Sequence, residues 1–153
     1  MSGHITITLQ EKYNFLKQEL EGKSKRYYPF VISEGLLDEK EQILKQLKSE
    51  LQDNLILAPT FASPKDLFLF IKSFSDSILL FEDEILTRRI EYIRVLEGAI
   101  CSNPDSSKLW EVNYESEKSF TFYGGIVIVS RLKKSELKSR KQLKYILRDC
   151  IVI

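Results

Sequence analysis

Apolar residues in this chain follow two patterns, short continuous runs and stripes with helical spacing. Runs of four to seven residues rich in aromatic and β-branched side chains are typical of buried strands. Stripes that recur every three or four residues indicate amphipathic helices. The continuous runs lie at 27–33, 55–58, 77–81, 126–130 and 150–153. The stripes are Leu9, Tyr13, Leu16 and Leu20; Ile43, Leu44, Leu47 and Leu51; and Ile90, Ile93, Leu96 and Ile100.

Residues typical of helix N-termini locate the starts of two of the predicted helices. Asp38 is predicted to be the N-cap of the second helix, in a capping box with Glu41. Ser63 followed by Pro64 predicts the start of another helix that continues through 67–74, because proline is favoured in the first helical turn. Further helices are predicted over 8–21 and 133–147, and a hairpin is predicted from the alternating segments 109–114 and 120–123.

The order of these elements predicts the fold class. Continuous apolar strands separated by helices are typical of a parallel sheet that is buried on both faces. We therefore expect an α/β three-layer sandwich with a five-stranded, mostly parallel sheet, plus a small β-hairpin and an N-terminal helix. A length of 153 residues suits one domain, with 1–26 as a helical extension and 27–153 as the α/β domain.

Charge and cysteine content narrow the function classes. With 23 Lys and Arg against 22 Asp and Glu, the chain lacks the general positive field of most nucleic-acid binders, so any such contact must be local. Neither a membrane-spanning run nor a signal peptide is visible, which predicts a cytoplasmic protein with no membrane partner. Cys101, Cys150 and one histidine do not form a zinc or disulfide pattern, so no structural metal is expected.

Candidate chemistry lies where the predicted strands end. Ligands of parallel sheets bind beyond the carboxyl ends of the strands, which here points to 33–39, 82–84 and 130–131. A carboxylate at a strand end can hold Mg²⁺ while its neighbour orients a water. Glu82 and Asp83 are therefore the candidate catalytic residues, and Asp83 is the candidate metal ligand; a solvated strand end is the alternative interpretation.

From residue 27 to 153 the chain resembles the AAA+ ATPases, a family of P-loop NTPases, in their compact bacterial and phage-type form. The matching segments are ILLFEDE at 78–84, FTFYGGIVIVS at 120–130 and RDCIVI at 148–153. The resemblance implies a P-loop fold with ATP and Mg²⁺ as possible ligands. It also implies that Ser130 and Arg131 occupy the sensor position and Arg148 the arginine position. The family's small helical lid has no counterpart here.

The phosphate loop departs from the family pattern G-x-x-x-x-G-K-[ST]. Residues 33–42 read SEGLLDEKEQ, in which Gly35 and Lys40 remain as candidate nucleotide-binding residues. The second glycine is missing, and Glu41 replaces the hydroxyl that would bind Mg²⁺. Arg131 likewise replaces the sensor asparagine. These departures predict a filled, inactive phosphate site.

The leading hypothesis is therefore a pseudo-ATPase: an AAA+-like domain that no longer hydrolyses ATP efficiently and acts as a binding or assembly module for a protein partner or for further copies of itself. One alternative is a working ATPase that uses Lys40 for phosphates and Glu82 and Asp83 for Mg²⁺ and water. Another is a nucleic-acid accessory protein that uses the lysine-rich helix, which is otherwise interpreted as a solvated face.

Aromatic residues offer a further choice between base stacking and core packing. Their positions inside apolar runs favour core packing. The residues concerned are Tyr27, Tyr28, Phe30, Phe68, Phe70 and Phe74.

Overall fold

A computed structural model describes residues 11, 14, 30–32, 37–52, 55–100, 111–130, 132, 134–148 and 151–152. The body of its sheet consists of β2 (Leu55–Leu57), β3 (Ile78–Glu82) and β4 (Gly125–Val129), which pair in parallel. Two shorter strands, β1 (Phe30–Ile32) and β5 (Ile151–Val152), extend the order to β2-β3-β4-β1-β5. The longest pairing joins β3 to β4 over five residues, from Ile78 opposite Gly125 to Glu82 opposite Val129.

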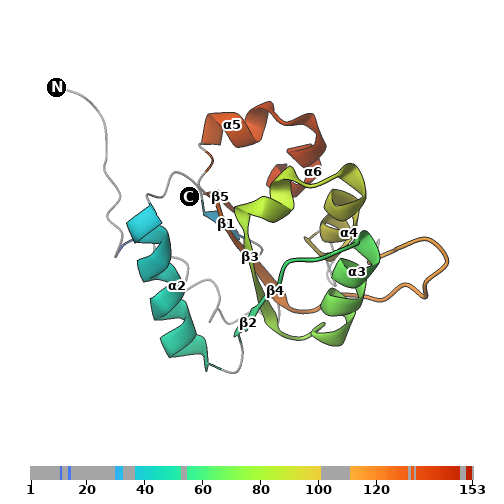
Figure 1. The fold of residues 1–153 in the computed structure, drawn as a ribbon, viewed down its shortest axis with the longest axis horizontal. Helices are drawn as coiled ribbons and strands as arrows, with labels where there is room; N and C mark the ends of the chain where they lie inside the picture. The colour runs from blue at the N-terminus through green and yellow to red at the C-terminus, as the bar shows by residue number, and fades with distance from the viewer. Residues whose placement is uncertain are drawn as a thin grey trace.

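Helices connect the strands and cover the sheet (Figure 1). The helix α2 lies on one side of the strands, whereas α3, α4 and α6 lie on the other. A 3-10 turn follows β3, and a second one joins α5 to α6. The bounds are α2 (Leu37–Leu51), α3 (Pro64–Ser73), η2 (Asp83–Thr87), α4 (Ile90–Ile100), α5 (Lys134–Ser139), η3 (Lys141–Leu143) and α6 (Lys144–Arg148).

The predicted start of α3 is confirmed. Ser63 is its N-cap and accepts a hydrogen bond from the Asp66 backbone N–H at 3.2 Å, while Pro64 takes the first helical position. Asp38, in contrast, lies inside α2, which begins at Leu37. The prediction that Asp38 caps this helix is therefore wrong, because an N-cap residue lies outside the helical turns.

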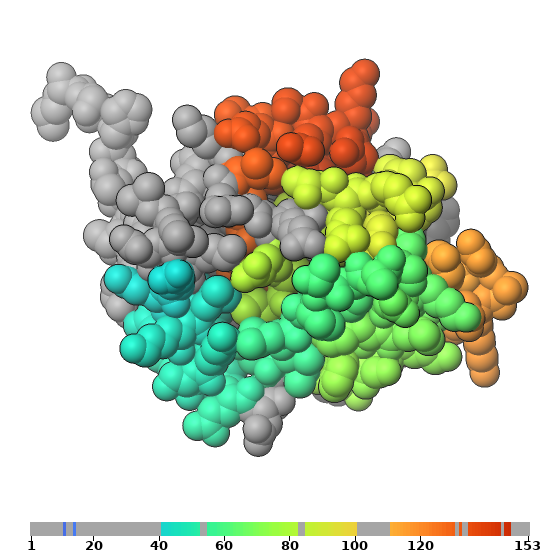
Figure 2. All heavy atoms as spheres, viewed as in Figure 1, coloured from blue at the N-terminus to red at the C-terminus, as the bar shows by residue number. Residues whose placement is uncertain are grey.

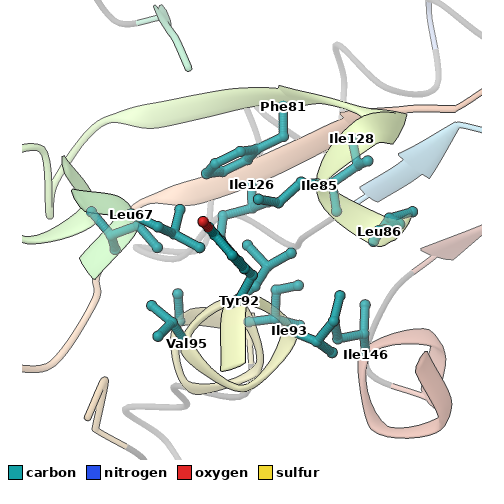
Figure 3. Packing of buried hydrophobic residues seen from close by; sticks show 14 of the residues in the cluster. Leu67, Phe81, Ile85, Leu86, Tyr92, Ile93, Val95, Ile126, Ile128 and Ile146 are labelled. Carbon is teal, nitrogen blue, oxygen red and sulfur yellow. The ribbon is translucent and has the colours of Figure 1, made fainter. Parts of the chain in front are cut away.

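Side chains on the two faces of the sheet enter separate clusters. Strand residues alternate between faces, so Leu79 and Phe81 pack with α3 and α4, whereas Ile78 and Leu80 pack against α2. Figure 3 shows the larger cluster, in which Phe81 and its strand neighbours face Tyr92 and Ile93 of α4. On the α2 side, the buried residues of the predicted stripe are Ile43 and Leu47.

The predicted fold class needs correction. The structure supports a small α/β fold built on the three parallel strands β2, β3 and β4, with β1 and β5 added as short strands at one edge, and not the regular five-stranded three-layer sandwich that the sequence predicted. Within the described residues, the apolar runs at 27–33 and 150–153 contribute strands of three and two residues, whereas β3 and β4 have five residues each. Among the described residues, the buried cluster on the α3 and α4 side is much larger than that against α2.

The expected hairpin and N-terminal extension are also altered or undescribed. In the described part of 109–123, the hairpin is reduced to one antiparallel bridge between Val112 and Phe120. The predicted extension at 1–26 lies outside the described residues except for Glu11 and Asn14, which are helical and exposed.

The lysine-rich helix predicted over 133–147 is broken into α5, η3 and α6. Its buried residues explain the break, because Leu137, Leu143 and Ile146 are all fully buried. At about 100° per residue, Leu137 and Leu143 would lie about 120° apart on a continuous α-helix. The 3-10 turn between them allows both side chains to reach the core.

Candidate functional site

The carboxyl ends of the parallel strands bring together two of the predicted site residues. Glu82 ends β3 and is exposed, and Ser130 directly follows β4. Since Glu82 is paired in register with Val129, Glu82 and Ser130 end adjacent strands. Ligands of parallel sheets bind at such an edge. We refer to the ends of β2, β3 and β4 together as the carboxyl edge.

Of the remaining predicted site residues, Asp83 directly follows Glu82 at this edge, whereas no contact that the structure describes brings Lys40 or Arg148 to it. Asp83 begins the 3-10 turn η2, so the acidic run passes from a strand into a turn. Lys40 belongs to α2 and Arg148 ends α6. Gly35 and Arg131 lie outside the described residues. The roles assigned to these five residues stay predictions.

Ser130 is the buried polar residue of the carboxyl edge. Its side chain is only 1% exposed, and its Oγ accepts a hydrogen bond from the Leu132 backbone N–H at 3.0 Å. The hydroxyl therefore holds the turn that leaves β4. A serine hydroxyl has one proton to donate and two lone pairs, and here one lone pair is already used inside the protein.

A small hollow lies beside Glu82. Its volume is about 60 Å³, and its apolar wall includes Phe61, Phe81 and Ile85. Arg88 lines the same hollow, and its guanidinium lies 5.0 Å from the centre of the Tyr92 ring and donates from Nη1 to Tyr92 Oη at 3.3 Å. The hollow is therefore large enough for water or for one small polar group.

The sequence reasoning missed Arg88. No motif marks this residue, because its place at the hollow depends on the turn η2, which the hydrophobic pattern did not predict. The twin arginines at 88 and 89 after an acidic run were the available signal, and they do not by themselves say which of the two faces inward.

A larger, shallow groove runs along α3. Its volume is about 410 Å³, and its lining includes Phe61, Leu69, Phe70 and Phe74 as well as Asp66. The rings of Phe61 and Phe70 are 5.3 Å apart, and those of Phe70 and Phe74 are 5.2 Å apart. We call this surface the α3 groove. It adjoins the small hollow, because Phe61 lines both.

Large apolar side chains are exposed at and near the α3 groove. Leu69 is 40% exposed and Phe74 is 37% exposed, and both line the groove. Core packing was predicted for Phe68, Phe70 and Phe74. That prediction is right for Phe68 and wrong for Phe74, because Phe74 is the C-cap of α3, where the helix no longer faces the sheet.

A displaced pKa is found away from the carboxyl edge. Burial raises the pKa of the Glu97 carboxyl above its usual value, and the Arg94 guanidinium opposes this effect. Displaced pKa values often mark functional groups, but Glu97 lies in the second half of α4, beyond the residues that line the hollow. Within the described residues no group of three or more His, Cys, Asp or Glu side chains is arranged to hold a metal ion.

Comparison with known proteins does not assign this chain to a family. No model of a protein family matches this chain, and no curated protein sequence matches it either. In the part of the chain that the structure describes, no helix is long and apolar enough to cross a membrane.

Proposed function

We propose that this chain is a binding or assembly module, related to the AAA+ ATPases by the sequence features of its second half, that does not hydrolyse ATP efficiently. The observation that carries the proposal is the exposed apolar surface at the α3 groove. Exposed apolar side chains that adjoin one another mark sites of protein interaction. Leu69 and Phe74 offer such a surface in a groove that a partner's side chains can enter. We place the protein in the cytoplasm, with a second copy or another protein as its partner.

The start of α2 supports the loss of hydrolysis. In the family the helix after the phosphate loop begins with the lysine and hydroxyl that bind nucleotide and Mg²⁺. Here α2 begins at Leu37, and Asp38 and Glu39 occupy its first turn. Carboxylates favour the positive end of a helix dipole and repel the phosphates of a nucleotide. The Ser130 hydroxyl also supports the loss of hydrolysis. Because it already accepts a hydrogen bond from the Leu132 N–H, its capacity to orient a water is reduced.

Nucleotide binding can be tested by thermal unfolding with and without ATP and Mg²⁺. We expect no shift of the melting temperature at millimolar nucleotide. A micromolar site would add about 4 kcal/mol to the free energy of unfolding, which for a domain of this size corresponds to a rise on the order of 10 °C. A rise of that size, together with ATP hydrolysis that Asp83→Asn abolishes, would contradict the proposal and favour the working-ATPase alternative.

Self-assembly through the α3 groove can be tested by sedimentation equilibrium. We expect wild-type protein to associate as its concentration rises, and the double variant L69S/F74S to weaken association by about tenfold or more, because half-exposed apolar side chains lose their contribution to the interface. The matched control is I90S/Y123S, which replaces two other exposed apolar residues, 42% and 53% exposed. Equal effects of the two double variants would contradict the role of the groove. A strictly monomeric wild type would exclude self-assembly.

A further inference from the structure

We propose that the exposed face of residues 134–148, here called the basic segment, binds nucleic acid through the phosphate backbone. This site is separate from the α3 groove and does not depend on the function proposed above. In Figure 1, α5 lies at one end of the molecule and β2 at the other. Figure 2 shows the same separation on the surface, with the basic segment in orange-red above and the β2–α3 region in green below.

The charge of the basic segment stands out against the rest of the chain. It contains six basic residues and one acid, Glu136. The whole chain has 23 basic and 22 acidic residues, so the remainder has 17 basic and 21 acidic residues. A near-neutral protein thus combines a basic end with an acidic remainder. This is the local basic surface that nucleic-acid binding requires when the net charge is close to zero.

The basic side chains are carried on a fixed backbone. Leu137, Leu143 and Ile146 are fully buried and anchor all three parts of the segment in the larger core cluster. The break is closed by hydrogen bonds, from the Arg140 N–H to the Leu137 carbonyl at 3.2 Å and from the Leu143 N–H to the Arg140 carbonyl at 3.0 Å. Because the backbone is already ordered, binding a phosphate backbone costs mainly the side-chain entropy of the lysines.

Three lysines are exposed along this anchored backbone. Lys138, Lys141 and Lys144 recur at a spacing of three residues, and each is solvent-exposed, while Arg140 between them is half-buried. In the 3-10 turn from Lys141 to Leu143, residues three apart lie nearly above one another. Lys141 and Lys144 are therefore presented from the same side of the segment, which suits successive contacts along a strand of phosphates.

The apolar residues of the segment favour nucleic acid over an anionic membrane. A helix that lies on a membrane needs an exposed apolar face to enter the acyl boundary. Here Leu137, Leu143 and Ile146 point into the protein core and are unavailable to lipid. What remains for a partner is positive charge, whose natural complement is a regular array of phosphates.

The test is binding of the full chain to a 20-base-pair DNA duplex, measured by fluorescence anisotropy between 50 and 200 mM salt. We expect the affinity to fall about a hundredfold across this range if about four phosphates are contacted, since the logarithm of affinity falls with a slope of about 0.9 per contact. Neutralising the patch with K138Q/K141Q/K144Q is expected to weaken binding at 50 mM salt at least tenfold and to flatten the salt dependence. Its melting temperature is expected to stay that of the wild type, because all three side chains are exposed.

The matched control is K45Q/K48Q/K72Q, which removes the same charge from exposed lysines of α2 and α3. We expect this control to keep nearly the wild-type affinity. Equal weakening by both triple variants would overturn the proposal, because the effect would then come from net charge alone. The proposal would also be overturned if wild-type protein failed to bind the duplex below about 100 μM at 50 mM salt, the weak end of non-specific binding, or bound vesicles with 30% phosphatidylserine but not DNA.

Discussion

Replacing Phe68 with alanine is expected to lower the free energy of unfolding by about 3–5 kcal/mol, the usual cost of truncating a buried phenylalanine. Phe68 is fully buried on α3. Its ring lies 5.2 Å from that of Phe120 and 6.2 Å from that of Tyr114. The side chain therefore holds the segment 111–123 against α3 as well as filling the core. Because whole domains are stable by only about 5–15 kcal/mol, the variant loses a large share of the total.

The control for this prediction is Phe74→Ala, at the end of the same helix. Phe74 is 37% exposed, and its described ring contact is with Phe70 at 5.2 Å. We expect the control to cost about 1–2 kcal/mol, less than Phe68→Ala, because more than a third of Phe74 is already in water whereas Phe68 is fully buried. Urea unfolding followed by circular dichroism measures both variants. Equal losses in stability would contradict the packing of α3 described here, in which Phe68 faces inward and Phe74 outward.

Much of the local structure could be predicted because its signals are local. Ser63 and Pro64 mark the start of α3 through hydrogen bonding and backbone geometry that involve only neighbouring residues. The apolar run at 77–81 supplies most of β3, because the four residues after Ser77 are all apolar, as burial on both faces requires. Such signals give the kind and place of an element without reference to the rest of the fold.

Other features depend on contacts that no local pattern encodes. Ile90 continues the apolar stripe of α4, yet it is 42% exposed because it is the first residue of the helix, beyond the edge of the core. Arg88 reaches the small hollow only because η2 turns the chain after β3.

The candidate site likewise combines features that local sequence signals predict with features that depend on contacts elsewhere in the fold. The rule for parallel sheets predicts a site at the carboxyl edge, and the strand register places Glu82 and Ser130 at the ends of adjacent strands there. Whether a serine is available to a ligand depends on its own hydrogen bonds, and the bond from the Leu132 N–H to Ser130 Oγ arises from a turn whose geometry the sequence did not specify. The α3 groove was missed because its exposed phenylalanine was assigned to the core.

Gly124→Ala is expected to be the most damaging substitution that adds a single methyl group. Gly124 is buried just before β4, and a Cβ atom there would overlap the backbone carbonyl oxygen of Ser77 and come within 2.8 Å of the Phe122 ring. The Ser77 carbonyl cannot retreat freely, because it accepts a hydrogen bond from the Gly125 N–H at 3.2 Å. The Tyr123 N–H also binds the Ser75 carbonyl at 2.9 Å. The chain segments before β3 and β4 thus meet backbone to backbone, and glycine provides the necessary space.

The expected loss for Gly124→Ala is about 3 kcal/mol, at the upper end of what overpacking usually costs, or a fall in melting temperature of roughly 6–12 °C. Gly98→Ala is the matched control, because a Cβ there would come no closer than 3.0 Å to the Glu111 carbonyl oxygen. Its helical position on α4 gains about 0.5–1 kcal/mol from alanine, which offsets the tighter contact, so we expect a change within about 1 kcal/mol. Differential scanning calorimetry of both variants measures these changes in stability and melting temperature. Similar melting temperatures for the two would show that the segments preceding β3 and β4 do not meet as closely as the structure describes.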